Sequence, residues 1–136
     1  MSPKIVTSGM PNSLSEAPGA AAIAEGIRRV EGFLREIGPR FARADVYAQL
    51  LRMRLYADWN GAAPLDRKAA CEEAQALAGF QAASADPRID GGFYFGRKGA
   101  EWMPYINPVS TAFAIEALAL WECHARGARP LRHLLI

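Results

Sequence analysis

The sequence has little cysteine, little imbalance of charge and no long hydrophobic run. Its two cysteines, Cys71 and Cys123, are too few for a disulfide-stabilised scaffold. Each lies in an alanine-rich, helix-like segment, where a buried and reduced thiol is expected. The 16 basic and 14 acidic side chains give a net charge of only +2. This balance argues against nucleic acid or an anionic membrane surface as the partner.

No apolar run approaches the ~18 residues that span a membrane, and no apolar leader follows a basic start. We therefore expect a cytoplasmic protein that binds neither membrane nor nucleic acid. The chain has 136 residues, 51% of them apolar, which is typical of one globular domain. Residues 1–18 are rich in proline and serine, and are predicted to be a flexible lead-in to a single helical domain at 19–136.

Four segments are predicted to be helices. The first ends before Gly38-Pro39, and its apolar residues recur at steps of three and four: Ile23, Ile27, Val30, Leu34 and Ile37. The second is predicted from Asp45, as its N-cap, to Trp59, and the third follows at 66–81 with Asp66 as its cap. The fourth begins at Asn107-Pro108, where asparagine suits the N-cap and proline suits the first turn.

The fourth helix carries almost no charge, because Glu116 is the only charged residue between Ala112 and Trp121. A helix that is apolar nearly all round is usually covered on most sides. Two helical hairpins alone would leave part of it open. We therefore expect an all-α fold of two hairpins, in which either the preceding loop or a second copy of the chain covers this helix. A homo-oligomer, or a complex with another protein chain, is the predicted state.

The segment between the third and fourth helices carries a recognisable pattern. It reads "FQAASADPRIDGGFYFGR", followed by "NPVSTAFAIEALALW". The glutamine, the Asp-Gly-Gly-Phe turn and the Thr-Ala cadence of the next helix resemble one repeat of the α/α-toroid superfamily, across roughly residues 44–124. That superfamily includes squalene and terpene cyclases and the β subunits of protein prenyltransferases. The resemblance implies stacked helical hairpins whose inner helices are apolar all round. A closed toroid of this family has about six hairpins, and this chain has two.

The sequence departs from the catalytic patterns of that family. It lacks the Asp-x-Asp-Asp acid motif of the cyclases. Cys123 and His124 are adjacent on a helix and so point about 100° apart, which is unsuited to the zinc site of the prenyltransferases. We therefore expect no metal or cofactor. The favoured function is a small helical interaction domain that associates through the apolar helix 108–124. The alternative is a ligand-binding or catalytic toroid fragment, acting on an isoprenoid-like or carbohydrate-like substrate.

Three carboxylates are the candidate catalytic residues. Asp86 and Asp90 flank Pro-Arg-Ile ahead of a glycine pair, and could hold a divalent cation or serve in acid–base chemistry. The favoured interpretation is that both form turns by bonding to their own backbone. A buried Glu116 would have a raised pKa and could donate a proton. The favoured interpretation is an exposed position or a pair with an arginine.

The loop aromatics are the candidate ligand-binding residues, together with one arginine: Phe93, Tyr94, Phe95, Arg97, Trp102 and Tyr105. The rings could line an apolar pocket, with Arg97 holding an anionic group. The favoured interpretation is a small core under a long loop. Gly91-Gly92 is predicted to adopt positive φ in a tight turn, so that Gly92→Val would damage folding.

Overall fold

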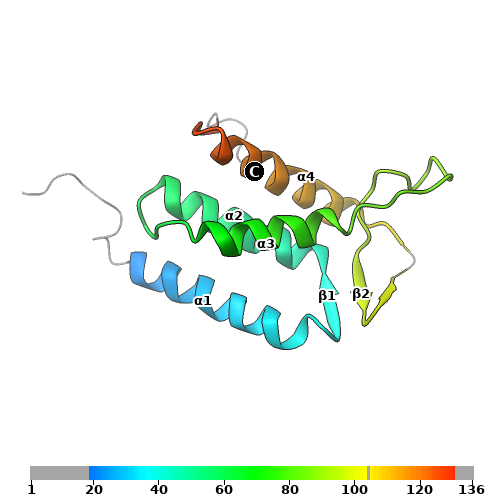
Figure 1. Cartoon of the computed structure of the whole chain (residues 1–136), viewed down its shortest axis with the longest axis horizontal. Coiled ribbons are helices and arrows are strands. Elements are labelled where there is room, and N and C mark those ends of the chain that lie inside the picture. The colour runs from blue at the N-terminus through cyan, green and yellow to red at the C-terminus, as the bar shows by residue number, and fades with distance from the viewer. Residues whose placement is uncertain (1–18, 104, 131–136) are drawn as a thin grey trace, which may run out of the picture.

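The computed structural model describes residues 19–103 and 105–130, and the described fold is mostly helical, with four helices and a small three-stranded sheet (Figure 1). The helices are α1 (Ala20–Ile37), α2 (Ala44–Trp59), α3 (Arg67–Ala78) and α4 (Pro108–Ala125). The strands are β1 (Phe41–Arg43), β2 (Gly96–Lys98) and β3 (Glu101–Trp102). The predicted lead-in, residues 1–18, lies outside the described residues.

Helix α2 is the centre of the fold, because it packs against α1, α3 and α4. Figure 1 shows α1 and α4 on opposite sides of it. Its buried apolar residues form the main core together with α3, α4 and the loop. The largest fully buried apolar side chains are Phe80, Phe93, Leu51, Leu55 and Leu77. Alanines fill the contacts where the helices come closest: Ala48 on α2, Ala70 and Ala74 on α3, and Ala114 and Ala117 on α4.

The helix caps decide where the helices begin. Asp66 accepts a hydrogen bond from Ala69 N at 3.0 Å, which confirms it as the cap of α3. Asn107 accepts from the first backbone N–H groups of α4, also as predicted. The expected cap of α2 is wrong. That helix begins at Ala44, directly after β1, and the carboxylate of Asp45 pairs instead with Arg43 at 2.6 Å.

The small sheet is the main addition to the predicted all-α architecture. Its strands run antiparallel in the order β1-β2-β3, with Ala42 opposite Arg97 and Arg97 opposite Trp102. It ties the link between α1 and α2 to the loop between α3 and α4. Two- and three-residue strands are too short to show a period-two pattern, so the sequence did not predict them.

The glycine turn differs from its predicted geometry. Gly91 has φ +85°, whereas Gly92 lies outside the positive-φ region. Gly92 is needed for space instead, because a Cβ there would lie 2.8 Å from Ile106 Cγ2 and 3.3 Å from Ile89 O.

Gly92→Val is therefore expected to lower the free energy of unfolding by about 1–3 kcal/mol through steric overlap, measured by urea denaturation. Gly91→Ala meets no neighbouring atom and should lose about 1–2 kcal/mol through backbone strain alone. If Ile106 is the obstacle, Ile106→Ala should reduce the effect of Gly92→Ala. Additive losses from those two changes would contradict this explanation.

Helix α4 is less enclosed than its composition predicts. One side packs against α2 and α3, where Ser110, Ala114, Ala117 and Leu120 are buried. The opposite side is exposed within the monomer. The expectation that the loop covers this helix is therefore wrong for that side, while cover by a second chain remains a prediction.

Candidate functional site

The two loop carboxylates are engaged in local turns. Asp86 accepts from the backbone N–H of Arg88 at 2.9 Å and also pairs with the Arg88 guanidinium at 2.8 Å. These hydrogen bonds from Arg88 lower the pKa of Asp86 below its ordinary value. Asp90 accepts from the backbone N–H of Ser84 at 2.9 Å. The Asp86 contact is that of a turn-forming aspartate, as the favoured interpretation expected, whereas Asp90 holds a backbone N–H six residues earlier in the loop.

Glu116 points into the protein and forms an ion pair with Arg52 of α2. Both side chains are only about a tenth exposed, at 10% and 11%. The guanidinium of Arg52 also lies over the rings of Phe113 and Tyr56. Glu116 is thus the buried partner of an arginine. The single charge in the middle of α4 is turned inward.

The loop aromatics fall into three environments. Phe93 is 2% exposed and belongs to the main core. Tyr94 and Trp102 stack with ring centroids 5.4 Å apart, and Arg97 lies over the Trp102 ring. Phe95 stacks on Tyr105 at 5.5 Å. Most of this aromatic surface is therefore used in packing one ring on another, and Trp102 and Tyr105 remain 39% and 47% exposed.

The residues of the glutamine and glycine pattern contact one another. Gln81 donates its side-chain N–H to Gly91 O at 3.0 Å and pairs with Phe93 in an isolated bridge. Phe93 N in turn donates to Thr111 Oγ1 at 3.1 Å. These hydrogen bonds join the end of α3, the turn and the first turn of α4 in one unit.

Comparison with known protein families, with characterised proteins and with solved structures finds no match to this chain. Within 19–103 and 105–130, no group of three His, Cys, Asp or Glu side chains is placed to hold a metal ion. None of the described helices is long and apolar enough to cross a membrane. We therefore infer the function from the surfaces and polar contacts of the described residues.

The outer face of α4 is the first of two apolar surfaces. We define it by its exposed residues: Pro108, Val109, Ala112, Ile115 and Ala119. Val109 and Ile115 are 60% and 57% exposed. Helices that face water normally present polar residues on that side. Here Glu116 is buried against Arg52, so the first charge along the outer face is Glu122, near the end of the helix.

The second surface is an apolar groove between α1 and α2, with a volume of about 450 Å³. Its lining is almost entirely apolar, with Asp45 as the only charged residue. The lining residues are Ile23, Gly26, Ile27, Val30, Asp45, Val46, Gln49, Leu50 and Met53. Three of the large apolar side chains remain open to water, namely Ile23, Val30 and Met53. The sequence shows the apolar residues of α1 recurring at steps of three and four, but it does not show that several of these side chains stay exposed.

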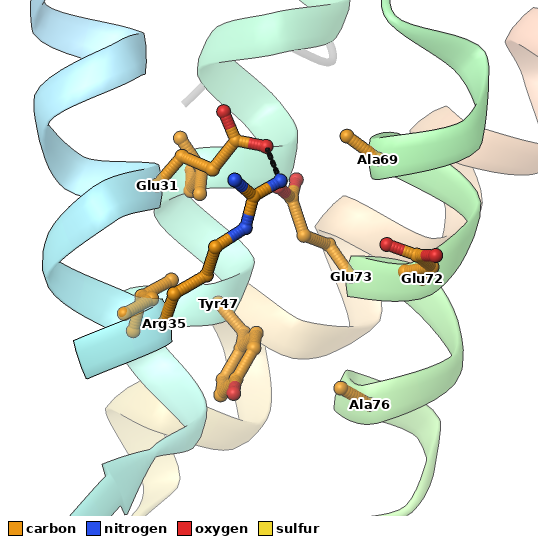
Figure 2. A pocket seen from close by; sticks show the side chains of 9 residues that line it. Glu31, Arg35, Tyr47, Ala69, Glu72, Glu73 and Ala76 are labelled. Carbon is orange, nitrogen blue, oxygen red and sulfur yellow. Dashed lines mark hydrogen bonds and ion pairs between the residues drawn. The ribbon is translucent and has the colours of Figure 1, made fainter. Parts of the chain in front are cut away.

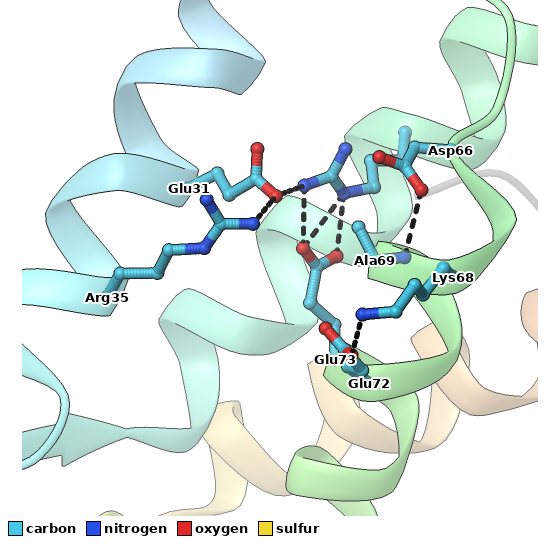
Figure 3. Close-up of polar contacts among 8 residues, drawn as sticks. Glu31, Arg35, Asp66, Lys68, Ala69, Glu72 and Glu73 are labelled. Atoms are coloured by element: carbon cyan, nitrogen blue, oxygen red, sulfur yellow. Dashed lines mark hydrogen bonds and ion pairs between the residues drawn. The ribbon is translucent and has the colours of Figure 1, made fainter.

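On the other side of α1 lies a polar gap that the sequence analysis missed. Figure 2 shows Glu31 and Arg35 of α1 facing Glu72 and Glu73 of α3 across a pocket of about 200 Å³. Arg54 of α2, only 6% exposed, does not line this pocket but pairs with two of the carboxylates that do, Glu31 and Glu73. Arg54 pairs with Glu73 at 2.8 Å and with Glu31 at 3.3 Å. Figure 3 shows that Glu31 also pairs with Arg35.

Burial and charge pairing act in opposite directions on Arg54 and on Glu73. Burial by itself would lower the pKa of Arg54, but hydrogen bonds and attraction from Glu73, with a contribution from Glu31, raise it overall. Burial raises the pKa of Glu73, against the opposing pull of Arg54. The burial of Arg54 had a signal in the sequence, because Arg54 lies three and four residues after Leu51 and Leu50, on the buried side of α2.

A second polar contact joins the far ends of α2 and α4. His124 Nε2 lies 2.6 Å from Asp58 Oδ2, and Arg67 Nη2 lies 3.3 Å from His124 Nδ1. The His124 ring also packs on Trp59. Since an arginine can only donate, the Arg67 contact makes His124 Nδ1 an acceptor and leaves Nε2 to donate to Asp58. His124 therefore pairs with a carboxylate of the opposite helix.

The hydrogen bond from His124 lowers the pKa of Asp58 below its ordinary value. A carboxylate with a lowered folded-state pKa stabilises the fold above its unfolded pKa, and this contribution is lost as the pH falls through the folded pKa. We expect the stability difference between wild type and Asp58→Asn to shrink as the pH falls below about 4. Urea denaturation at stepped pH measures it, and a difference independent of pH down to 2 would contradict the assignment.

Proposed function

We propose that this chain is a small helical interaction domain that associates with a second copy through the outer face of α4. The observation that carries the proposal is the uncovered apolar face itself. Val109 and Ile115 project from it, Ala112 and Ala119 leave room beside Ile115, and the helix's central charge is buried. Exposed apolar patches on small proteins commonly mark contact surfaces.

The proposal extends to the arrangement of the helices as α/α-toroid hairpins. Its support is the contact among Gln81, the Gly91-Gly92 turn, Phe93 and Thr111, which makes the family-like pattern one structural unit. In a chain with only two hairpins, each hairpin has one side against which no further hairpin packs. Association with further copies would cover those faces.

Ile115→Arg tests the proposal. Wild-type protein is expected to give an average mass above that of one chain, increasing with concentration, in size-exclusion chromatography with light scattering. The variant should weaken association at least tenfold, because a buried unpaired charge costs more than 1.4 kcal/mol at a contact. Ile115 is 57% exposed, so the monomer should keep its helical circular dichroism.

Ala21→Arg is the matched control, since it adds the same charge at an exposed position of α1. It should associate as wild type does. Wild-type protein that remains a monomer at every concentration, or an Ile115→Arg variant that associates normally, would contradict the proposed surface.

A further inference from the structure

We propose that a pocket between α1 and the start of α3 binds a small primary amine that carries a neutral hydrogen-bond acceptor beside its ammonium group. The pocket has a volume of about 260 Å³. It lies beside α1, which Figure 1 shows across α2 from α4, so the pocket is separate from the outer face of α4. Ligand binding here does not depend on the proposed self-association.

Arg54 supplies the donor of this pocket. It lines the pocket, although its side chain is only 6% exposed. Its Nε and Nη2 atoms contact Glu73 and Glu31, whereas Nη1 has no partner within 19–103 and 105–130. A donor on so enclosed a side chain is normally paired. A ligand oxygen in the pocket would complete the hydrogen bonds of this guanidinium.

Two carboxylates of the same pocket supply acceptors. The Oε2 atom of Glu31 is already engaged by Arg35 and Arg54. The Oδ1 atom of Asp66 accepts from Ala69 N as the cap of α3. Glu31 Oε1 and Asp66 Oδ2 are left over, and Figure 3 marks no contact to either. An ammonium group has three N–H donors and no acceptor, so it matches a pocket that offers carboxylate oxygens.

The balance of charge favours a cation. Burial lowers the pKa of Arg54, but a hydrogen bond to Glu73 and the attraction of three carboxylates raise it overall: Glu73, Glu31 and Asp66. Glu31 also pairs with Arg35. Three carboxylates and two arginines leave one negative charge. A ligand with one positive charge and a neutral acceptor suits this balance better than a zwitterion or an anion.

The rest of the lining suits a compact aliphatic group. Arg28 is paired with Glu25, and the other lining residues are apolar: Ala24, Ile27, Ala63 and Pro64. Small-molecule sites commonly combine apolar walls with a few placed polar groups. The volume lies below the ~300–1,000 Å³ typical of pockets for drug-sized ligands. The ligand should therefore be as small as the amide of one amino acid.

L-Valinamide is the probe, because it joins an ammonium group, a carbonyl acceptor and a branched aliphatic side chain. Added to the isotope-labelled full chain at about pH 6.5, where an α-amino group is protonated, it should shift the backbone amide signals of the lining residues. We expect these shifts to saturate with a dissociation constant of about 1 mM. Isobutylamine lacks the acceptor and isovaleramide lacks the charge, so each should bind roughly tenfold more weakly.

Asp66→Asn tests the carboxylate side of the site. Asparagine caps a helix about as well as aspartate, so α3 should keep its start while the pocket loses one charge. The affinity for valinamide should fall by roughly fivefold or more. Glu72→Gln is the matched control, because it removes the same charge from an exposed residue of α3 that does not line this pocket. Glu72→Gln and Ile115→Arg should both bind valinamide as wild type does.

Four outcomes would overturn the site. They are the absence of saturable shifts with valinamide, equal affinity for isobutylamine, equal affinity for isovaleramide, and wild-type affinity in Asp66→Asn. If Asp66→Asn loses helical circular dichroism, Ala24→Met replaces it, since the longer side chain should fill the pocket from α1 and abolish binding; wild-type affinity in that variant equally contradicts the site. Self-association is read from Ile115→Arg and amine binding from Asp66→Asn, so either proposal can fail while the other stands.

Discussion

Replacing Arg54 with methionine is expected to lower the free energy of unfolding by about 3–5 kcal/mol, because it removes one member of a buried ion network. Arg54 is 6% exposed and holds Glu73 at 2.8 Å. Without the guanidinium, the Glu73 carboxylate would be buried with no compensating charge. Urea denaturation followed by circular dichroism measures the loss. Because burial already raises the pKa of Glu73, the loss should be smaller in acid, where this side chain is neutral.

Two controls separate burial from simple loss of charge. Arg35→Met removes the other arginine that pairs with Glu31, but Arg35 is largely exposed, so the expected loss is below about 1 kcal/mol. The double variant Arg54→Met with Glu73→Leu removes the buried charge as well as its partner. It should recover most of the lost stability. A double variant as unstable as Arg54→Met would contradict the role assigned to Glu73.

Phe93→Ala is expected to cost about 3–5 kcal/mol, because the ring is 2% exposed and packed in the main core. The same measurement on Tyr105→Ala should show a loss below about 1.5 kcal/mol, since that ring is 47% exposed and stacks on Phe95 from outside. The pair distinguishes a core residue from a surface residue within one aromatic loop. A loss below 1 kcal/mol for Phe93→Ala would mean that the core reorganises around the missing ring.

The helices were predictable because their signals are local. Asp66 and Asn107 cap the helices that their own sequence neighbourhoods predict, and the glycine-proline pair stops α1 where expected. The sheet was not predictable, since its strands are too short for a pattern and β1 pairs with β2 across more than 50 residues of chain. The pairing of Arg54 with Glu73 also depends on how α2 and α3 pack.

The candidate site residues also divide into those whose contacts are local in sequence and those whose contacts depend on tertiary packing. The turn role of Asp86 follows from its immediate neighbours, and the structure agrees with it, whereas Asp90 bonds a backbone N–H six residues away. The loop aromatics have similar sequence surroundings, yet Phe93 is buried and Tyr105 is not. Tertiary packing decides between them. The sequence did not predict that the outer face of α4 is exposed, because composition reports how apolar a helix is and not how many neighbours it has.

The position of α1 has a consequence for how the protein opens. This helix rests mainly on α2, and its few buried residues form a small cluster apart from the main core, around Ile27 and Leu34. Grooves flank it on both sides. A segment held by so little buried surface exchanges its amide hydrogens through local detachment, before the remaining helices unfold. Amides of α1 should therefore exchange faster than those of α2, and occupancy of the neighbouring groove should slow them.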